Sequence, residues 1–139
     1  MEILIVHITD MHIENENDLN ILSSRTENIG GTICNHITTP QDTCVFVCVT
    51  GDFTNAGKEE QFIMANMVLE DIFSVLKRRY PDVDIYTIFV PGNHDCDFEH
   101  PNSGVRNVLL KSQCFDITDT NQMKQCTSIQ KTFLILPKK

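Results

Sequence analysis

The chain has 139 residues, of which 41% are hydrophobic, so it is long enough for one domain with a core and too apolar for a disordered chain. Its formal net charge of -8 argues against a surface that holds nucleic-acid phosphates by bulk electrostatics, although a phosphate substrate at a metal site stays open. The six cysteines include no CxxC pair, and the N-terminal apolar run lacks a basic flank. We therefore expect reduced thiols, no signal peptide or membrane span, and a cytoplasmic location.

Three short apolar runs predict β-strands. They are Ile3 to Thr9, a run that begins at Cys44 and ends at Gly51-Asp52, and Asp84 to Val90. The first run is apolar almost throughout, as in a strand that is covered on both faces. We therefore expect it to be the central strand.

Two helical patterns separate these strands. Asp18 to Ile37 has apolar residues loosely at helical spacing, with Asp18 as the expected N-cap and Gly30-Gly31 as a point where the helix would divide. Lys58 to Arg79 is the clearest helix, because its apolar residues fall on one face and Pro81 stops it.

The alternation of strand and helix predicts an α/β fold with parallel strands joined by right-handed crossovers. The carboxyl ends of such strands lie along one edge of the sheet. We therefore expect Asp10, Asp52 and Asn93, which follow the three strands, to share that edge.

The pattern weakens after Cys96. Val105 to Lys111 predicts a short helix, and Asp116 to Ser128 predicts a partly helical stretch. The last apolar run, Thr132 to Leu136, is a candidate strand.

The first two strand ends carry donors suited to a divalent metal ion. Asp10 and His12 are two residues apart, so the carboxylate and the imidazole point the same way from an extended backbone. Asp52 follows Gly51, which allows a sharp turn, and one carboxylate can bridge two metal ions about 3.5 to 4 Å apart. Each short pattern alone is more often an ordinary turn.

The third strand end adds an amide and a proton-transfer group. Asn93 offers a neutral oxygen, His94 is placed to protonate or stabilise a leaving oxygen, and Asp95 is available to orient a ring. Three such patterns in an order that fits one sheet indicate a metal site. The oxygen-rich donor set suits Mn, Fe or Zn.

These three blocks, Asp10-x-His12, Gly51-Asp52-x4-Gly57 and Gly92-Asn93-His94-Asp95, resemble the first three signature blocks of the calcineurin-like metallophosphoesterases. The resemblance covers residues 1 to about 100 and implies an α/β/β/α sandwich with two divalent metal ions. It implies that Asp10 and His12 hold one ion, that Asp52 bridges, and that Asn93 binds the second ion. His94 and Asp95 are then the candidate catalytic residues.

Two positions separate this chain from the Ser/Thr protein phosphatases that the resemblance includes. Those enzymes carry Arg before the closing glycine of the second block and Glu after the histidine of the third, where this chain has Ala56 and Asp95. The resemblance therefore favours a phosphodiesterase, nucleotidase or nuclease, with a nucleotide or a nucleic acid as candidate substrates.

The histidines that complete the site in the family are missing. The family supplies them from a second half, in a Gly-His pair and a Gly-His-x-His block, and this chain has no histidine after His100. We expect residues 1–139 to form only the N-terminal portion of a metallophosphoesterase domain, an incomplete sandwich whose truncation puts its activity in question. The alternative is a non-catalytic remnant that acts as a metal-binding or regulatory interaction module.

An incomplete sandwich has a structural consequence. Without the second sheet, one face of the first sheet stays uncovered, which makes it a surface for self-association or for a partner. We expect no contact with a membrane.

Overall fold

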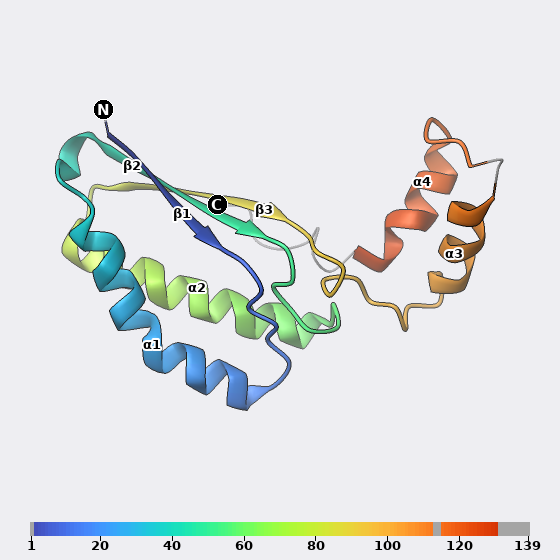
Figure 1. Ribbon diagram of the computed structural model, residues 1–139, viewed down its shortest axis with the longest axis horizontal. Coiled ribbons are helices and arrows are strands. Elements are labelled where there is room, and N and C mark those ends of the chain that lie inside the picture. The colour runs from blue at the N-terminus through green and yellow to red at the C-terminus, as the bar shows by residue number, and fades with distance from the viewer. Residues whose placement is uncertain (1, 113–114, 131–139) are drawn as a thin grey trace.

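The computed structural model describes residues 2–112 and 115–130, and these form an α/β fold (Figure 1). A parallel sheet contains β1 (Glu2–Ile8), β2 (Thr43–Thr50) and β3 (Asp84–Val90) in the order β1-β2-β3. The connections are α1 (Glu16–Asn35), which is followed by the short 3-10 helix η1 (Pro40–Asp42), and α2 (Glu59–Arg79). The predicted parallel strands and crossover helices are confirmed.

The prediction that the first strand is central is wrong, because β2 lies between β1 and β3. Burial shows the difference: alternate residues of β2, such as Val45 and Val47, are buried, whereas β1 alternates between half-buried and exposed residues. The exposed residues of β1 include Ile3 and Ile5, so the nearly continuous apolar run does not reflect cover on both faces.

The core lies between the sheet and the two helices, which cover the same face (Figure 1). Leu69 and Leu76 of α2 are buried there against the valines of β2. Helix α1 packs against α2 through Gly30, since a Cβ at that position would lie 2.6 Å from the Cβ of Val75. Gly30 therefore allows close helix packing, and α1 continues through the glycine pair without dividing.

Helix α1 begins earlier than predicted. Its N-cap is Asn15, whose side chain accepts a hydrogen bond from the Asn17 amide at 2.9 Å. Asp18 is not the N-cap: it lies at the third helical position and accepts from the Asn15 amide at 3.3 Å, which completes a capping box.

No described element covers the opposite face of the sheet, as expected (Figure 1). Its side chains include Ile3 and Ile5 of β1, 54% and 67% exposed, and Tyr86 and Ile88 of β3, 48% and 47% exposed. Phe46 of β2 stacks on Tyr86 with 5.2 Å between ring centroids.

The described part of the chain ends in a helical arm beyond the strand ends. It contains α3 (Ser103–Lys111), α4 (Thr120–Thr127) and the 3-10 helix η2 (Ser128–Gln130), so both predicted helical stretches are present. The arm is tied back to the loop after β3, because the Asp97 amide donates to the Ile129 carbonyl at 2.8 Å. The candidate strand Thr132 to Leu136 lies outside the described residues.

The structure also bears on the expected absence of a membrane span and on the state of the cysteines. Within residues 2–112 and 115–130, no helix is both long and apolar enough to cross a membrane. The five described cysteines are free thiols, which agrees with the reduced state expected from the sequence.

Glu2 joins three segments at the start of the sheet. Its carboxylate accepts hydrogen bonds from the Thr43 hydroxyl at 2.7 Å and from the Thr38 and Thr39 amides, both at 3.2 Å. The Thr43 hydrogen bond and the bonds from Thr38 and Thr39 lower the pKa of Glu2 from 4.5 to about 2.

This network makes stability depend on pH. A carboxyl whose pKa is lowered by folding stabilises the fold above its unfolded value of 4.5, and that contribution is lost as the pH falls toward 2. We expect Glu2→Gln to lower the thermal midpoint at pH 7, with the difference from the parent shrinking as the pH falls below 4.5. Thermal unfolding followed by circular dichroism checks this, with the exposed Glu14→Gln as the control. A difference that does not vary with pH would refute it.

Candidate metal centre

Three backbone hydrogen bonds bring the loops after the strands together. The Asp10 amide donates to the Gly51 carbonyl at 3.2 Å, and the Gly51 amide donates to the Val90 carbonyl at 2.7 Å. The His12 amide donates to the Asp52 carbonyl at 2.9 Å. The pairing between neighbouring strands therefore extends beyond their ends and sets the positions of the loops.

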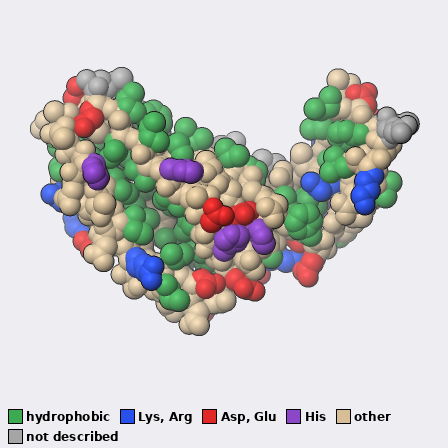
Figure 2. All heavy atoms as spheres, viewed as in Figure 1, with side chains coloured by type: hydrophobic (Ala, Val, Ile, Leu, Met, Phe, Trp, Pro, Cys, Tyr) green, Lys and Arg blue, Asp and Glu red, His purple; other side chains and the backbone are tan. Residues whose placement is uncertain are grey.

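His12, Asp52 and His94 form the closest group of metal-ligating side chains. One potential ligand atom of each lies within 4.8 Å of the others. Asp52 Oδ2 is 3.9 Å from His12 Nε2, and the two imidazole rings meet edge to face with 4.7 Å between centroids. All three residues are half-buried. Figure 2 shows acidic and histidine side chains gathered at this end of the sheet.

The other two predicted ligands lie at the margin of this group. Asp10 is 62% exposed, with Oδ1 3.7 Å from His12 Nε2, and its Oδ2 accepts a hydrogen bond from the Thr9 hydroxyl at 2.6 Å. Asn93 is exposed on the loop after β3. The structure thus brings together one residue of each sequence block, His12, Asp52 and His94, with Asp10 next to His12.

The candidate ligands have an unusual backbone conformation. Asp10, His12 and Asp52 have φ angles of 55°, 48° and 50°, and they are the three non-glycine residues with positive φ among those described. Residues other than glycine avoid this region because Cβ approaches the carbonyl oxygen, at a cost of about 1–2 kcal/mol per residue. Such strain collects at functional sites, where the surrounding structure enforces it.

Two glycines allow the second and third loops to touch. Gly51 has a φ of +86° and faces Gly92. A Cβ on Gly92 would lie 2.2 Å from Asp52 Oδ1 and 2.4 Å from the Asp52 amide nitrogen. No side chain fits in that space, so the position of Asp52 depends on Gly92.

Hydrogen bonds orient Asp52 and His94. Asp52 Oδ1 accepts from the His94 amide at 2.9 Å, which leaves Oδ2 on the side of His12. His94 Nδ1 is 2.8 Å from the Asn55 carbonyl oxygen, which only accepts, so Nδ1 carries the proton in this bond. A neutral His94 then presents the lone pair of Nε2. Sequence reasoning missed Asn55, since a main-chain carbonyl leaves no signal in the residue type.

Asp95 is buried behind these residues, with 1% exposure. Its Oδ1 accepts from the Thr54 amide at 2.8 Å and lies 3.1 Å from the Thr54 hydroxyl, while Oδ2 accepts from the Gly92 amide at 2.9 Å. These bonds join the second loop to the third, and the ring of His94 is oriented instead by Asn55. Thr54 is a second residue that sequence reasoning missed.

Ion pairs connect the start of α2 to the loop that follows His94. Lys58, the N-cap of α2, lies 2.8 Å from Asp97 and 2.6 Å from Glu99. The hydrogen bonds to these carboxylates raise the pKa of Lys58. The loop that follows His94 is therefore held against the end of the second loop.

The remaining histidines lie away from the group. His7 is on the uncovered sheet face and pairs with Thr50, and His36 is the C-cap of α1. His100 accepts from the Asn102 amide at 3.1 Å.

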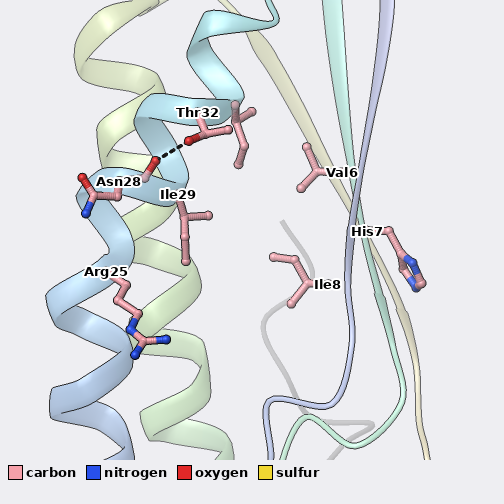
Figure 3. A pocket seen from close by; sticks show the side chains of 8 residues that line it. Val6, His7, Ile8, Arg25, Asn28, Ile29 and Thr32 are labelled. Atoms are coloured by element: carbon pink, nitrogen blue, oxygen red, sulfur yellow. Dashed lines mark hydrogen bonds between the residues drawn. The ribbon is translucent and has the colours of Figure 1, made fainter.

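The structure also has an open cleft of about 530 Å³ between β1 and α1. Val6 and Ile8 point toward α1 across it, whereas His7 points away (Figure 3). Its wall contains none of the predicted ligands, so it is separate from the candidate metal centre.

Comparison with known proteins identifies one family. A sequence model of the calcineurin-like phosphoesterases matches residues 3–137, and the match corresponds to the N-terminal part of the family. No curated protein matches the chain.

The contact between Gly92 and Asp52 predicts a severe effect of one methyl group. We expect Gly92→Ala to displace the Asp52 carboxylate and to weaken Mn²⁺ binding at least ten-fold, measured by isothermal titration calorimetry. Gly104→Ala is the matched control, because a Cβ there meets nothing within 4 Å. Equal affinity in the two variants would show that Gly92 does not shape the centre.

The positive φ of His12 predicts opposite effects on stability and binding. His12→Gly removes the imidazole and relieves the backbone, so we expect the metal-free chain to gain about 1 kcal/mol in free energy of unfolding. The gain in free energy of unfolding caused by Mn²⁺ should shrink in the same variant. Denaturant unfolding with and without metal measures both effects. A loss of stability without metal would contradict the argument from strain.

Proposed function

The chain belongs to the calcineurin-like phosphoesterase family, and from that premise we propose that it hydrolyses phosphoesters at a centre of two divalent metal ions. The observation that carries the proposal is that candidate ligand side chains and strained backbone conformations occur together at the carboxyl ends of the strands. The side chains that approach one another there come from residues in strained backbone conformations, Asp10, His12 and Asp52, and from His94 beside them. One residue with positive φ is common in an ordinary turn, but three such residues beside one group of ligand side chains are not.

The donor chemistry fits divalent metal ions. We propose Asp10 and His12 as ligands of one ion, Asp52 as the bridge, and Asn93 as a ligand of the second. Carboxylate oxygens with imidazole and amide donors suit Mn, Fe or Zn. When bound, such ions would supply positive charge that stabilises the phosphoryl oxygens in the transition state.

His94 is the proposed proton-transfer group. With Nδ1–H donated to the Asn55 carbonyl, Nε2 is the atom that can hold a proton for a leaving oxygen. Asp95 supports His94 from behind as a positioning residue, because its carboxylate fixes the loops that carry Asp52 and His94.

A phosphodiester is the proposed substrate class, with nucleotides and nucleic acids as candidates. Ala56 precedes the closing glycine of the second block, where the Ser/Thr protein phosphatases of the family have Arg, so this position offers no guanidinium to hold a phosphomonoester dianion. We place residues 1–139 in the N-terminal portion of the metallophosphoesterase domain.

Metal binding without turnover is a second candidate function. Among the described residues, the close group holds three ligand side chains, which is few for two ions. A module that binds metal and interacts with other molecules needs no more.

The test is hydrolysis of bis(p-nitrophenyl) phosphate by the purified chain in excess Mn²⁺, with p-nitrophenyl phosphate as the monoester comparison. We expect Asp52→Asn to abolish hydrolysis and metal uptake, while Asp71→Asn, an exposed aspartate of α2, behaves like the parent. His94→Ala should keep the metal and lower kcat roughly 10²- to 10⁴-fold.

The possible results separate the candidates. Metal uptake that depends on Asp52 without hydrolysis of either ester favours the binding module. Hydrolysis that persists in Asp52→Asn would refute the proposed centre. Loss of metal in His94→Ala would make His94 a ligand.

A further inference from the structure

Gln61 is a buried polar side chain beside the candidate metal centre that the proposed function leaves without a role. It lies in the first turn of α2 and is 5% exposed. Its Oε1 accepts a hydrogen bond from the Ala56 amide at 2.8 Å, and its Nε2 donates to the Glu14 carbonyl at 3.4 Å. One side chain therefore contacts both the loop after β1 and the loop after β2.

The bond to Ala56 reaches His94 through a single peptide group. The Ala56 N–H and the Asn55 C=O belong to the same planar trans peptide, so they point in opposite directions and turn together. The N–H donates to Gln61 Oε1, and the C=O oxygen lies 2.8 Å from His94 Nδ1. A continuous line of hydrogen bonds thus runs from Gln61 through this peptide group to the imidazole ring.

The neighbouring peptide groups are held by other partners. The Asn55 amide donates to the Ile13 carbonyl at 3.1 Å, and the Gly57 amide donates to the Thr54 hydroxyl at 3.1 Å. The peptide group between them could rotate about its two Cα atoms and turn the Asn55 carbonyl away from the ring without breaking either bond. The hydrogen bond to Gln61 opposes that rotation.

We propose that Gln61 is a positioning residue, which holds the Asn55–Ala56 peptide group so that its carbonyl keeps the proton of His94 on Nδ1. The hydrogen bond made by one ring nitrogen decides which tautomer of a neutral histidine is present. The bond to Gln61 also polarises the peptide group and strengthens its bond to the ring. The catalytic consequence, a free Nε2, rests on the proposed function of His94, whereas the tautomer can be measured without metal or substrate.

Nitrogen-15 NMR of the imidazole rings in the metal-free chain tests this role, because the shifts of the ring nitrogens show which one carries the proton. At about pH 9, where imidazoles are neutral, we expect the parent chain to hold the His94 proton on Nδ1. Gln61→Met removes the acceptor at similar volume and should give a mixture of both tautomers. A parent chain with the proton on Nε2, or a Gln61→Met chain with the proton still on Nδ1, would overturn the inference.

Two further variants complete this measurement. Gln41→Met is the matched control and should behave like the parent, because Gln41 is an exposed glutamine of η1 at the start of β2. Gln61→Glu keeps an acceptor for the Ala56 amide, and a carboxylate at the third helical position suits a helix N-terminus. We expect Gln61→Glu to retain the Nδ1–H tautomer. A folded Gln61→Glu chain that has lost it would overturn the inference, even where Gln61→Met does not fold.

Hydrolysis of bis(p-nitrophenyl) phosphate separates this inference from the proposed function. Gln61→Met should lower kcat about ten-fold with KM and Mn²⁺ affinity unchanged, and it should add no loss to His94→Ala, because it acts through that ring. A further loss in the double variant would contradict the positioning role. A parent chain without hydrolysis would refute the proposed function alone, and the tautomer measurement would still decide the role of Gln61.

Discussion

The structure depends on the parallel pairing of three strands and on its continuation past their ends. Hydrogen bonds from Asp10 and His12 to the second loop, and from Gly51 to Val90, extend the ladder into the loops. The strand before each loop therefore sets the position of that loop. A sheet register set by apolar residues in the core therefore determines which polar side chains meet at the edge.

The continued pairing explains why the backbone of the candidate metal centre is strained. The extended pairing brings the loops so close that Asp10, His12 and Asp52 adopt positive φ, and Gly92 must lack a side chain. The buried carboxylate of Asp95 then bonds to Thr54 of the second loop and to Gly92 of its own loop, which holds these two loops together. The strain lowers stability at the edge of the sheet, at the residues that we propose as metal ligands.

The sheet is also a half-buried layer. Helices α1 and α2 cover one face, and the apolar residues of the other face contribute to the core only when something packs on them. The same strands thus carry two surfaces of different kinds. Their carboxyl ends hold the candidate metal centre, and their uncovered face offers an apolar contact.

The sequence by itself determined much of the fold and part of the candidate metal centre. The spacing of the apolar residues and the positions of Gly and Pro predicted the strands, the crossover helices and the shared edge with Asp52. These features depend on local spacing and on general rules of handedness. The strand order, the contact of His94 with the Asn55 carbonyl and the Asp95 bonds to Thr54 required the tertiary structure. Residue types record which side chains are apolar or charged, but a main-chain carbonyl is the same at every position, and an edge strand with an uncovered apolar face reads like a central one.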